Sequence, residues 1–300
     1  MNSMPVYKPE ILRDQELRAL LLQYRRENWE GIQTPQWQEQ IVESIVRDDG
    51  EAVLDLVAGF WNIPPRALVL DVGSGVGSFV LACRRRGLLA FGIEPDRIGR
   101  GGSLTSVQIA RRRIEEQVFA VAVGECLPFT DGGFDFVTMN QVMEHVADQK
   151  AVLLEALRVL KPGGAVYVAC PNYLRFYEPH YKIFWFPLFP KPLGRAYLRL
   201  RGRNPVLLDQ LTYTTNRRLR ALLSKCGAGY TILDLNREQF LKKFNHNSFA
   251  SGRARFVARA MRMPMLGRLI GWATMQFLSL TEGGCEMLLI RNRDYTGGTA

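Results

Sequence analysis

A short apolar run followed by three glycines, RALVLDVGSGVG at residues 66–77, constrains the fold more than any other part of the sequence. The apolar run predicts a buried strand, and Gly73, Gly75 and Gly77 predict a turn where a ligand approaches bare main chain. The stretch lacks the lysine of a P-loop, G-x-x-x-x-G-K-[ST]. It also departs from the dinucleotide fingerprint G-x-G-x-x-G, because a serine holds the third glycine position. The pattern that remains is D-x-G-x-G-x-G, beginning at Asp71.

Strand and helix patterns alternate on both sides of this turn. The expected strands are 67–72, 89–94, 118–123, 134–140, 165–170, 230–235 and 284–291, and the expected helices are 11–30, 36–58, 77–86, 103–116, 147–160 and 214–227. Short apolar strands separated by helices predict an α/β fold with a parallel sheet covered on both faces.

Two basic segments interrupt the alternation of strands and helices, so we expect them to be insertions within the fold and not linkers between domains. The first is dense in aromatic residues, prolines and arginines, and the second interleaves basic with apolar residues. The predicted organisation is an N-terminal helical lid (1–60), a ligand-binding core (61–171), a substrate-cap insertion (172–211), the core continued (212–236), a basic amphipathic insertion (237–281), and the last strand and tail (282–300).

Charge and cysteine usage limit the partners and the compartment. Residues 175–268 carry 19 basic and four acidic side chains, within a chain whose net charge is +10. This field favours an anionic partner such as a phosphorylated substrate, nucleic acid or an acidic lipid surface. Five cysteines without a CxxC pair indicate a reducing compartment. No secretory signal is evident, so we expect a cytoplasmic protein, with peripheral contact at the inner membrane face as an option.

The D-x-G-x-G-x-G pattern resembles the first motif of class I S-adenosylmethionine (SAM) methyltransferases. The stretch GECLPFTDGGFDFVTMNQVMEHV, the KPGG turn and TYTTNRRLRALLSKCG resemble the branch of that superfamily that includes quinone-biosynthesis enzymes. The likeness covers roughly 68–172 and 212–235. It implies SAM as the cofactor and a Rossmann-like sheet of seven strands, mostly parallel, whose last strand, 284–291, is antiparallel.

The resemblance also implies which residues contact the cofactor. They are Asp71, Gly73, Ser74, Gly75 and Gly77 for the methionine part, Glu94 and Pro95 for the ribose, Gly124, Glu125 and Cys126 for the adenine, and Asn140 after the fourth strand. The adenine contact departs from the family pattern, because Val123 stands where an aspartate is frequent. Glu125, or the main chain beside it, is the expected replacement.

Three histidines are candidates for proton transfer, which is needed only when the acceptor is a poorly acidic hydroxyl. His145, at the carboxyl edge of the sheet, and His180, at the start of the first insertion beside Glu178, are the expected catalytic residues. Local packing and an ordinary surface position are the alternatives for them, and His246 is expected to be structural or exposed. No metal site is expected, because Glu144 and His145 are adjacent and no i, i+4 pair of ligands exists.

The N-terminal loop and the insertions leave several interpretations open. Trp29, Gln33 or Trp37 would lie near the pocket if the leading helices form a lid, although simple packing of the tryptophans is favoured. The basic segment 255–280 is expected to pack on the core, with binding to an anionic membrane as the alternative. Nucleic acid is a less favoured partner, because the basic residues lie on very hydrophobic segments.

These patterns together predict a SAM-dependent methyltransferase. The expected reaction is O-methylation of a small or lipid-linked anionic metabolite, glycan or quinone-like. The alternatives are an RNA methyltransferase and, from a different class, a SAM-binding partner protein without catalysis.

Overall fold

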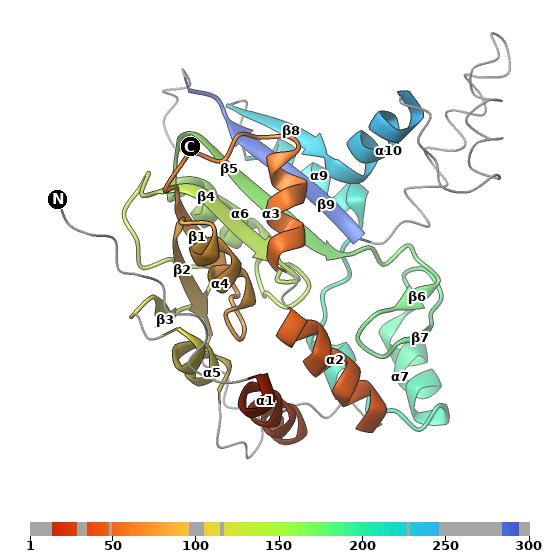
Figure 1. Cartoon of the computed structure of the whole chain (residues 1–300). Coiled ribbons are helices and arrows are strands. Elements are labelled where there is room, and N and C mark those ends of the chain that lie inside the picture. Colours follow the sequence, from red (N-terminus) through yellow and green to blue (C-terminus); the bar gives the residue numbers. More distant parts are fainter. Residues whose placement is uncertain are drawn as a thin grey trace, which may run out of the picture.

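The computed structural model describes residues 14–28, 35–47, 50–95, 105–114, 117–226, 229–245 and 284–293. A seven-stranded sheet with the order β3-β2-β1-β4-β5-β9-β8 forms its centre (Figure 1). The strands are β1 (Leu68–Val72), β2 (Leu89–Glu94), β3 (Phe119–Val121), β4 (Phe134–Asn140), β5 (Leu160–Pro171), β8 (Tyr230–Asp234) and β9 (Gly284–Arg291). β9 is antiparallel to both neighbours, and the other pairs of this sheet are parallel. The predicted sheet is therefore confirmed, including its antiparallel last strand.

The strand order reverses between β1 and β4. From β1 the chain builds outward through β2 and β3 on one side, then returns to place β4 and β5 on the other. In open parallel sheets such a reversal leaves a crevice beyond the carboxyl ends of the two central strands, which is where ligands bind. The glycine turn that follows β1 lies at this position.

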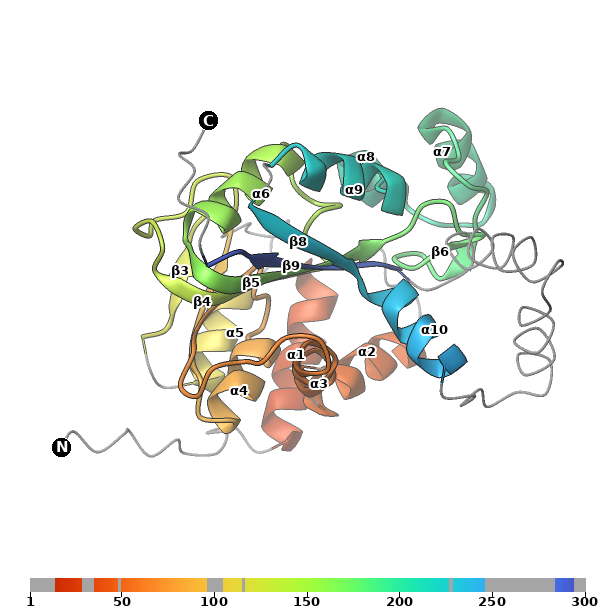
Figure 2. The same ribbon diagram turned by 90° about the horizontal axis from the view of Figure 1, so that it is seen from above.

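Helices cover both faces of the sheet (Figure 2). On one face lie α3 (Gly50–Ala58), α4 (Ser78–Arg85) and α5 (Ser106–Arg113), and on the other lie α6 (Gln149–Arg158) and α9 (Asn216–Ser224). Adjacent strand residues enter different cores: Val69 and Phe136 join the helices of the first face. Leu70 and Val137 join those of the second. Burial on both sides explains why these strands are almost uniformly apolar.

The segment predicted as one helix at 36–58 contains two, α2 (Pro35–Arg47) and α3, so that prediction was wrong. Its apolar residues serve different cores. Val42 of α2 packs with α1 (Asp14–Asn28), whereas Leu54 and Val57 of α3 pack over the sheet. Gly50 starts α3 where the backbone of α4 approaches closely, since an added Cβ would lie 2.9 Å from Phe79 Cα.

Two other boundaries differ from the prediction for local reasons. α5 begins three residues later than expected, because Thr105 caps it in a reciprocal arrangement with Gln108. β5 begins five residues earlier than expected, because the KPGG stretch continues the strand through a register shift opposite Phe134 and Phe136.

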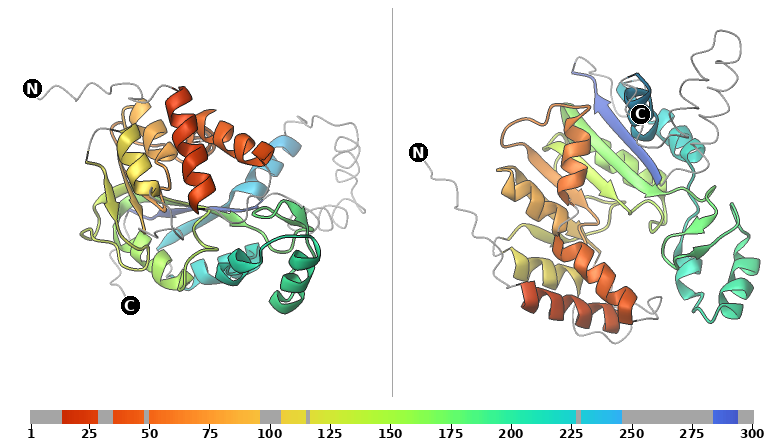
Figure 3. Two further views of the ribbon diagram at one scale, coloured as in Figure 1. Left: turned by 90° about the horizontal axis from the view of Figure 1, so that it is seen from below. Right: turned by 45° about the vertical axis from the view of Figure 1, so that its right-hand side comes forward.

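The insertion 172–211 forms a lobe beyond the carboxyl end of β5. It contains β6 (Tyr177–Glu178), β7 (Ile183–Phe184), α7 (Lys191–Leu200) and α8 (Val206–Gln210). The lobe has its own core, in which Trp185 packs with Leu198 and Leu208. Figure 3 shows the lobe and the N-terminal helices α1 and α2 at the same end of the sheet.

The second predicted insertion is described only over α10 (Leu235–Asn245). The amphipathic segment expected at 255–280 lies outside the described residues. Among the described helices, none combines the length and the apolarity that a membrane crossing requires.

Candidate active site

The turn between β1 and α4 depends on its three glycines, each of which has a positive φ: 74° at Gly73, 50° at Gly75 and 82° at Gly77. The outer two pack against protein. A Cβ on Gly73 would lie 2.5 Å from Val142 Cγ2, and one on Gly77 would lie 2.8 Å from Phe119 Cζ. A Cβ on Gly75 would meet nothing within 4 Å. The middle glycine therefore borders open space, as a turn that receives a ligand on its main chain requires.

Acidic and polar groups surround this turn. Glu94 ends β2, directly before the half-buried Pro95, and its Oε2 accepts a hydrogen bond from Gly75 N at 2.9 Å. Asp71 is buried, and burial together with the charge of Glu94 raises the pKa of its carboxyl well above the ordinary value. Ser74 Oγ is buried and has no hydrogen-bond partner among the described residues. Open main chain, an orphaned hydroxyl and a carboxylate at the end of β2 fit SAM.

The segment predicted to contact adenine follows β3. Gly124 is buried, and a Cβ there would lie 3.2 Å from each of two valine side chains. Glu125 Oε1 accepts a hydrogen bond from Ala147 N at 3.1 Å, so its carboxylate is held toward the turn after β4. Val123 and Cys126 are exposed, and Cys126 N donates to Val123 O.

An ion pair on α6 anchors the chain that follows this segment. Arg158 donates to the carbonyls of Leu127 and Phe129 at 3.0 and 2.8 Å, and Glu155 Oε2 accepts from Leu127 N at 2.7 Å. Arg158 and Glu155 also bind each other. The hydrogen bond from Arg158 lowers the pKa of Glu155. This pair therefore fixes the loop beside the predicted adenine position.

The turn after β4 is held in place by groups far away in the sequence. Asn140 ends β4 in an exposed position, and Gln141 adopts a φ of 59°, which is rare for a residue with a side chain. Thr212 N donates to Glu144 O at 2.7 Å. Gln149 Nε2 donates at 2.6 Å to the carbonyl of Met143, the residue before Glu144. The turn therefore presents Glu144 and its neighbour from a rigid scaffold.

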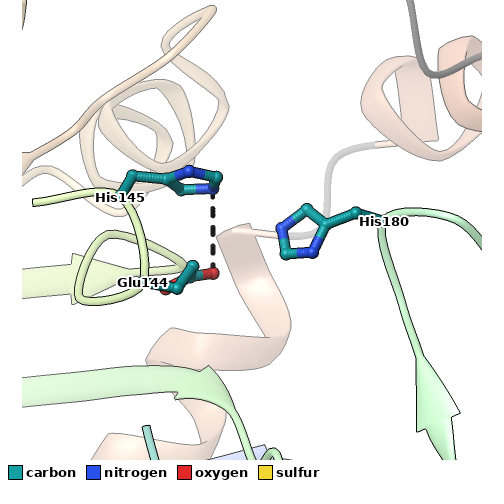
Figure 4. Close-up of side chains that lie close together, drawn as sticks. All are labelled: Glu144, His145 and His180. Atoms are coloured by element: carbon teal, nitrogen blue, oxygen red, sulfur yellow. Dashed lines mark ion pairs between the residues drawn. The ribbon is translucent and has the colours of Figure 1, made fainter. Parts of the chain in front are cut away.

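This turn and the lobe together form a cluster of three side chains, Glu144, His145 and His180, which we call the Glu-His-His cluster (Figure 4). One oxygen or nitrogen atom from each residue lies within 4.8 Å of those of the other two. His145 Nε2 is 4.0 Å from Glu144 Oε1, and the two imidazole rings are edge to face with centroids 5.3 Å apart. The side chain of Glu144 is fully buried, while those of His180 and His145 are 11% and 34% exposed.

A second carboxylate orients His180. Glu178 Oε1 lies 2.7 Å from His180 Nδ1, and because a carboxylate only accepts, Nδ1 carries the proton and Nε2 does not when the ring is neutral. Glu178 is itself buried and accepts from Tyr181 N at 2.6 Å. Burial alone would lower the pKa of His180, but the hydrogen bond and charge of Glu178, with the charge of Glu144, raise it above the ordinary value.

The carboxylate of Glu144 has a different environment. Neither of its oxygens has a hydrogen-bond partner among the described residues. Burial raises the pKa of Glu144 to about 7. Its ion-pair partner, His145 Nε2, is 4.0 Å away, beyond hydrogen-bond distance. A charged carboxylate with so distant a partner is costly to bury, so the group is suited to hold a proton or a cation.

The structure thus brings together the two histidines predicted to be catalytic, although they come from separate parts of the chain. Trp37 lies beside the lobe, with Lys182 Nζ 4.9 Å from the centre of its ring. Trp29, Gln33 and His246 lie outside the described residues.

Sequence reasoning missed the role of Glu144 and the position of Tyr24. Tyr24 lies on α1, where burial and the nearby charge of Glu94 raise the pKa of its hydroxyl. Nothing in the sequence around Tyr24 separates it from an ordinary packing residue, because its helical spacing matches that of the buried leucines of α1.

The sheet order, the glycine turn and Glu94 are those expected of a class I SAM-dependent methyltransferase. The chain belongs to a family described as a methyltransferase domain, whose sequence model matches residues 45–235. This match confirms the predicted methyltransferase class.

Individual curated relatives resemble about half of this chain, at 29–33% identity. The chain is 33% identical over 156 residues to an uncharacterized methyltransferase of Mycobacterium sp. (strain KMS), covering 50% of this chain and 59% of the relative. It is 29% identical over 168 residues to a demethylmenaquinone methyltransferase of Tropheryma whipplei (strain Twist), covering 53% and 65%. The chain therefore spans less than two thirds of the length of these relatives. Among solved structures, the YcgJ protein of Bacillus subtilis matches with a TM-score of 0.46 at 18% identity, covering 81% of this chain and 98% of that one.

Proposed function

We propose that this protein transfers the methyl group of SAM to an oxygen atom of a small or lipid-linked anionic metabolite, glycan or quinone-like. The observation that carries the proposal is the meeting of His145 and His180 beside the glycine turn. Val142, two residues before Glu144, is the side chain that a Cβ on Gly73 would strike, so the cluster adjoins the predicted methionine site. Proton-accepting groups at that position are what an acceptor hydroxyl needs.

Bound SAM supplies a methyl group already activated on a sulfonium, so the protein mainly binds, aligns and excludes water. Gly75 would receive the methionine part on bare main chain, and Glu94 would accept hydrogen bonds from the ribose. Leu17 and Leu21 of α1 pack with Ile109 of α5 and with Val76 of the turn, which supports a lid role for the N-terminal helices. His145 and His180 would orient the acceptor hydroxyl and take its proton.

The lobe supports an amphipathic acceptor. It exposes large apolar side chains, namely Phe176 (57%), Phe184 (50%), Phe186 (50%), Leu193 (58%) and Leu200 (87%). Phe184 contacts both of the other phenylalanines, with ring centroids 5.9 and 5.1 Å apart. Exposed apolar groups of this size mark interaction surfaces.

The charge of the same lobe supports an anionic acceptor. Seven basic residues lie within 172–211 against two acids, Glu178 and Asp209. Glu178 is buried against His180 and Asp209 pairs with Arg195, so both acids are partly neutralised. An apolar surface with cationic edges favours a lipid tail joined to an anionic head, taken up at an anionic membrane surface.

The proposal is tested with methyl-labelled SAM and three acceptors: a polyprenyl-linked hydroquinone, a water-soluble analogue without the tail, and total RNA. We expect label as a methyl ether on the lipid-linked acceptor, and a higher KM for that acceptor alone when Phe184 and Phe186 are both changed to serine. Label in RNA would refute the metabolite assignment. SAM binding by calorimetry without transfer to any acceptor would favour the non-catalytic partner protein.

The cofactor site has its own test. Glu94→Gln should raise the Kd for SAM at least tenfold, a loss of about 1.4 kcal/mol, because the amide cannot accept both ribose hydroxyl hydrogens. Glu51→Gln is the matched control, since Glu51 pairs with Arg86 on the outer surface of α3 and α4. Equal affinity of the Glu94 and Glu51 variants would remove Glu94 from the site.

A further inference from the structure

We propose that the Glu-His-His cluster binds a divalent transition-metal ion of the zinc type, with Glu144, His145 and His180 as its ligands. The ion would lie at the carboxyl edge of β4, between the core and the lobe. Sequence spacing predicted no metal, because it considered only ligands close together in the chain. The third ligand, His180, comes from the insertion 172–211 and meets the other two only in the folded chain.

The donor set is suited to such an ion. Two imidazole nitrogens and one carboxylate oxygen hold catalytic zinc, and the fourth position stays open for water or substrate. Ligand atoms in a tetrahedral zinc site are about 3.3 Å apart, as follows from metal–ligand distances of about 2.0–2.1 Å. The potential ligand atoms here are within 4.8 Å of one another, so the widest pair must close by up to about 1.5 Å. His145 is one third exposed and has room to make that movement.

Glu144 points to a ligand independently of this spacing. Its side chain is fully buried on the rigid turn after β4, and neither oxygen has a hydrogen-bond partner among the described residues. Buried carboxylates are otherwise hydrogen-bonded, closely paired or bound to metal, whereas the ion pair of Glu144 with His145 spans 4.0 Å. The rings of His145 and His180 lie beside this carboxylate (Figure 4). A shared ion would be bound by the nitrogen of each ring that faces Glu144.

Glu178 supplies the outer support that metal-binding histidines require. Its Oε1 fixes Nδ1 of His180 as the protonated nitrogen, which leaves Nε2 to bind the ion. Tyr181 N holds the other oxygen of Glu178. A carboxylate behind a histidine in this way orients the ring and raises its basicity as a ligand.

The role of the ion rests on the proposed function, and with the ion bound it would replace the proton-accepting role of His145 and His180. The ion would bind the acceptor oxygen in its open position and lower the pKa of that hydroxyl, whose proton leaves to solvent. A lone pair of the oxygen then forms the bond to the methyl carbon. The carbon–sulfur bond breaks with its electron pair remaining on sulfur, which gives S-adenosylhomocysteine and the methyl ether.

The binding test uses the full chain after dialysis against a chelator. Calorimetry with Zn²⁺ and the visible absorption of Co²⁺ should both give one ion per chain. Glu144→Gln and His180→Ala should each weaken binding at least tenfold. Glu178→Gln should weaken it by about 10- to 100-fold without removing a ligand. His246→Ala, which changes the third histidine of the sequence, is the control and should bind as wild type does.

Several outcomes would overturn the metal site. They are no stoichiometric binding of either ion, or binding that the Glu144 and His180 variants leave unchanged while circular dichroism shows them folded. SAM titrations of the same metal-free samples separate this failure from failure of the proposed function, because the glycine turn binds SAM without the ion. Methyl transfer at full rate in the metal-free protein would refute the catalytic role and leave an acid–base role for the cluster.

Discussion

Alanine substitutions at Gly73 and Gly75 should separate folding from cofactor binding within one turn. Both residues have a positive φ, so an alanine at either place is strained by about 1–2 kcal/mol. Alanine also restricts the unfolded chain more than glycine does, and this offsets about 0.4–1 kcal/mol of the strain in both variants. Only Gly73 adds a steric clash, since its Cβ would lie 2.5 Å from Val142 Cγ2. Overpacking of this kind costs about 1–3 kcal/mol, and that is the expected difference in stability between the two variants.

The variant that loses more stability should not be the variant that binds SAM more weakly. Gly75→Ala should unfold in urea close to the wild-type midpoint, yet bind SAM at least tenfold more weakly by calorimetry, because its Cβ occupies the open side of the turn. Gly73→Ala should lose stability in the absence of SAM. The reasoning fails if both variants lose the same stability, or if Gly75→Ala binds SAM with wild-type affinity.

Two further substitutions test the supports of the crevice. Arg158 lowers the pKa of Glu155, so the charged carboxylate contributes stability above its ordinary pKa of 4.5, and this contribution is lost as pH falls through the lowered value. Glu155→Gln should therefore be less stable than wild type at pH 7, by up to about 1 kcal/mol for such a partly exposed pair, and in thermal unfolding this difference should shrink as pH falls below 4.5. Arg113 is buried, and its NH1 donates to Val76 O and Ser78 Oγ, both at 2.9 Å. Arg113→Met should cost about 1–3 kcal/mol in urea unfolding and weaken SAM binding; an unchanged Kd would show that the turn keeps its shape without this donor.

The core of the fold was predictable because its signals are local. β2 and β4 fall on their predicted residues, since each is an apolar run bounded by residues that break it. The glycine turn was predictable for the same reason, because its positive φ values select the residue type. These features need no knowledge of what lies across the molecule.

The Glu-His-His cluster was only partly predictable. His145 and His180 could be proposed singly, but their approach depends on how the lobe folds back over β4. The burial of Glu144 depends on the same contact, so its sequence neighbours carry no sign of it. The prediction of one helix over 36–58 failed for a related reason, because the two halves pack in different cores.

The segments that enter and leave the lobe meet where Tyr173 N donates to Thr214 O at 2.9 Å, and the interior of the lobe is closed around Trp185. A part with its own interior that enters and leaves at one place can be exchanged while the cofactor crevice stays intact. Because His180 belongs to that part, such an exchange would alter the accepted molecule and the reactive cluster together.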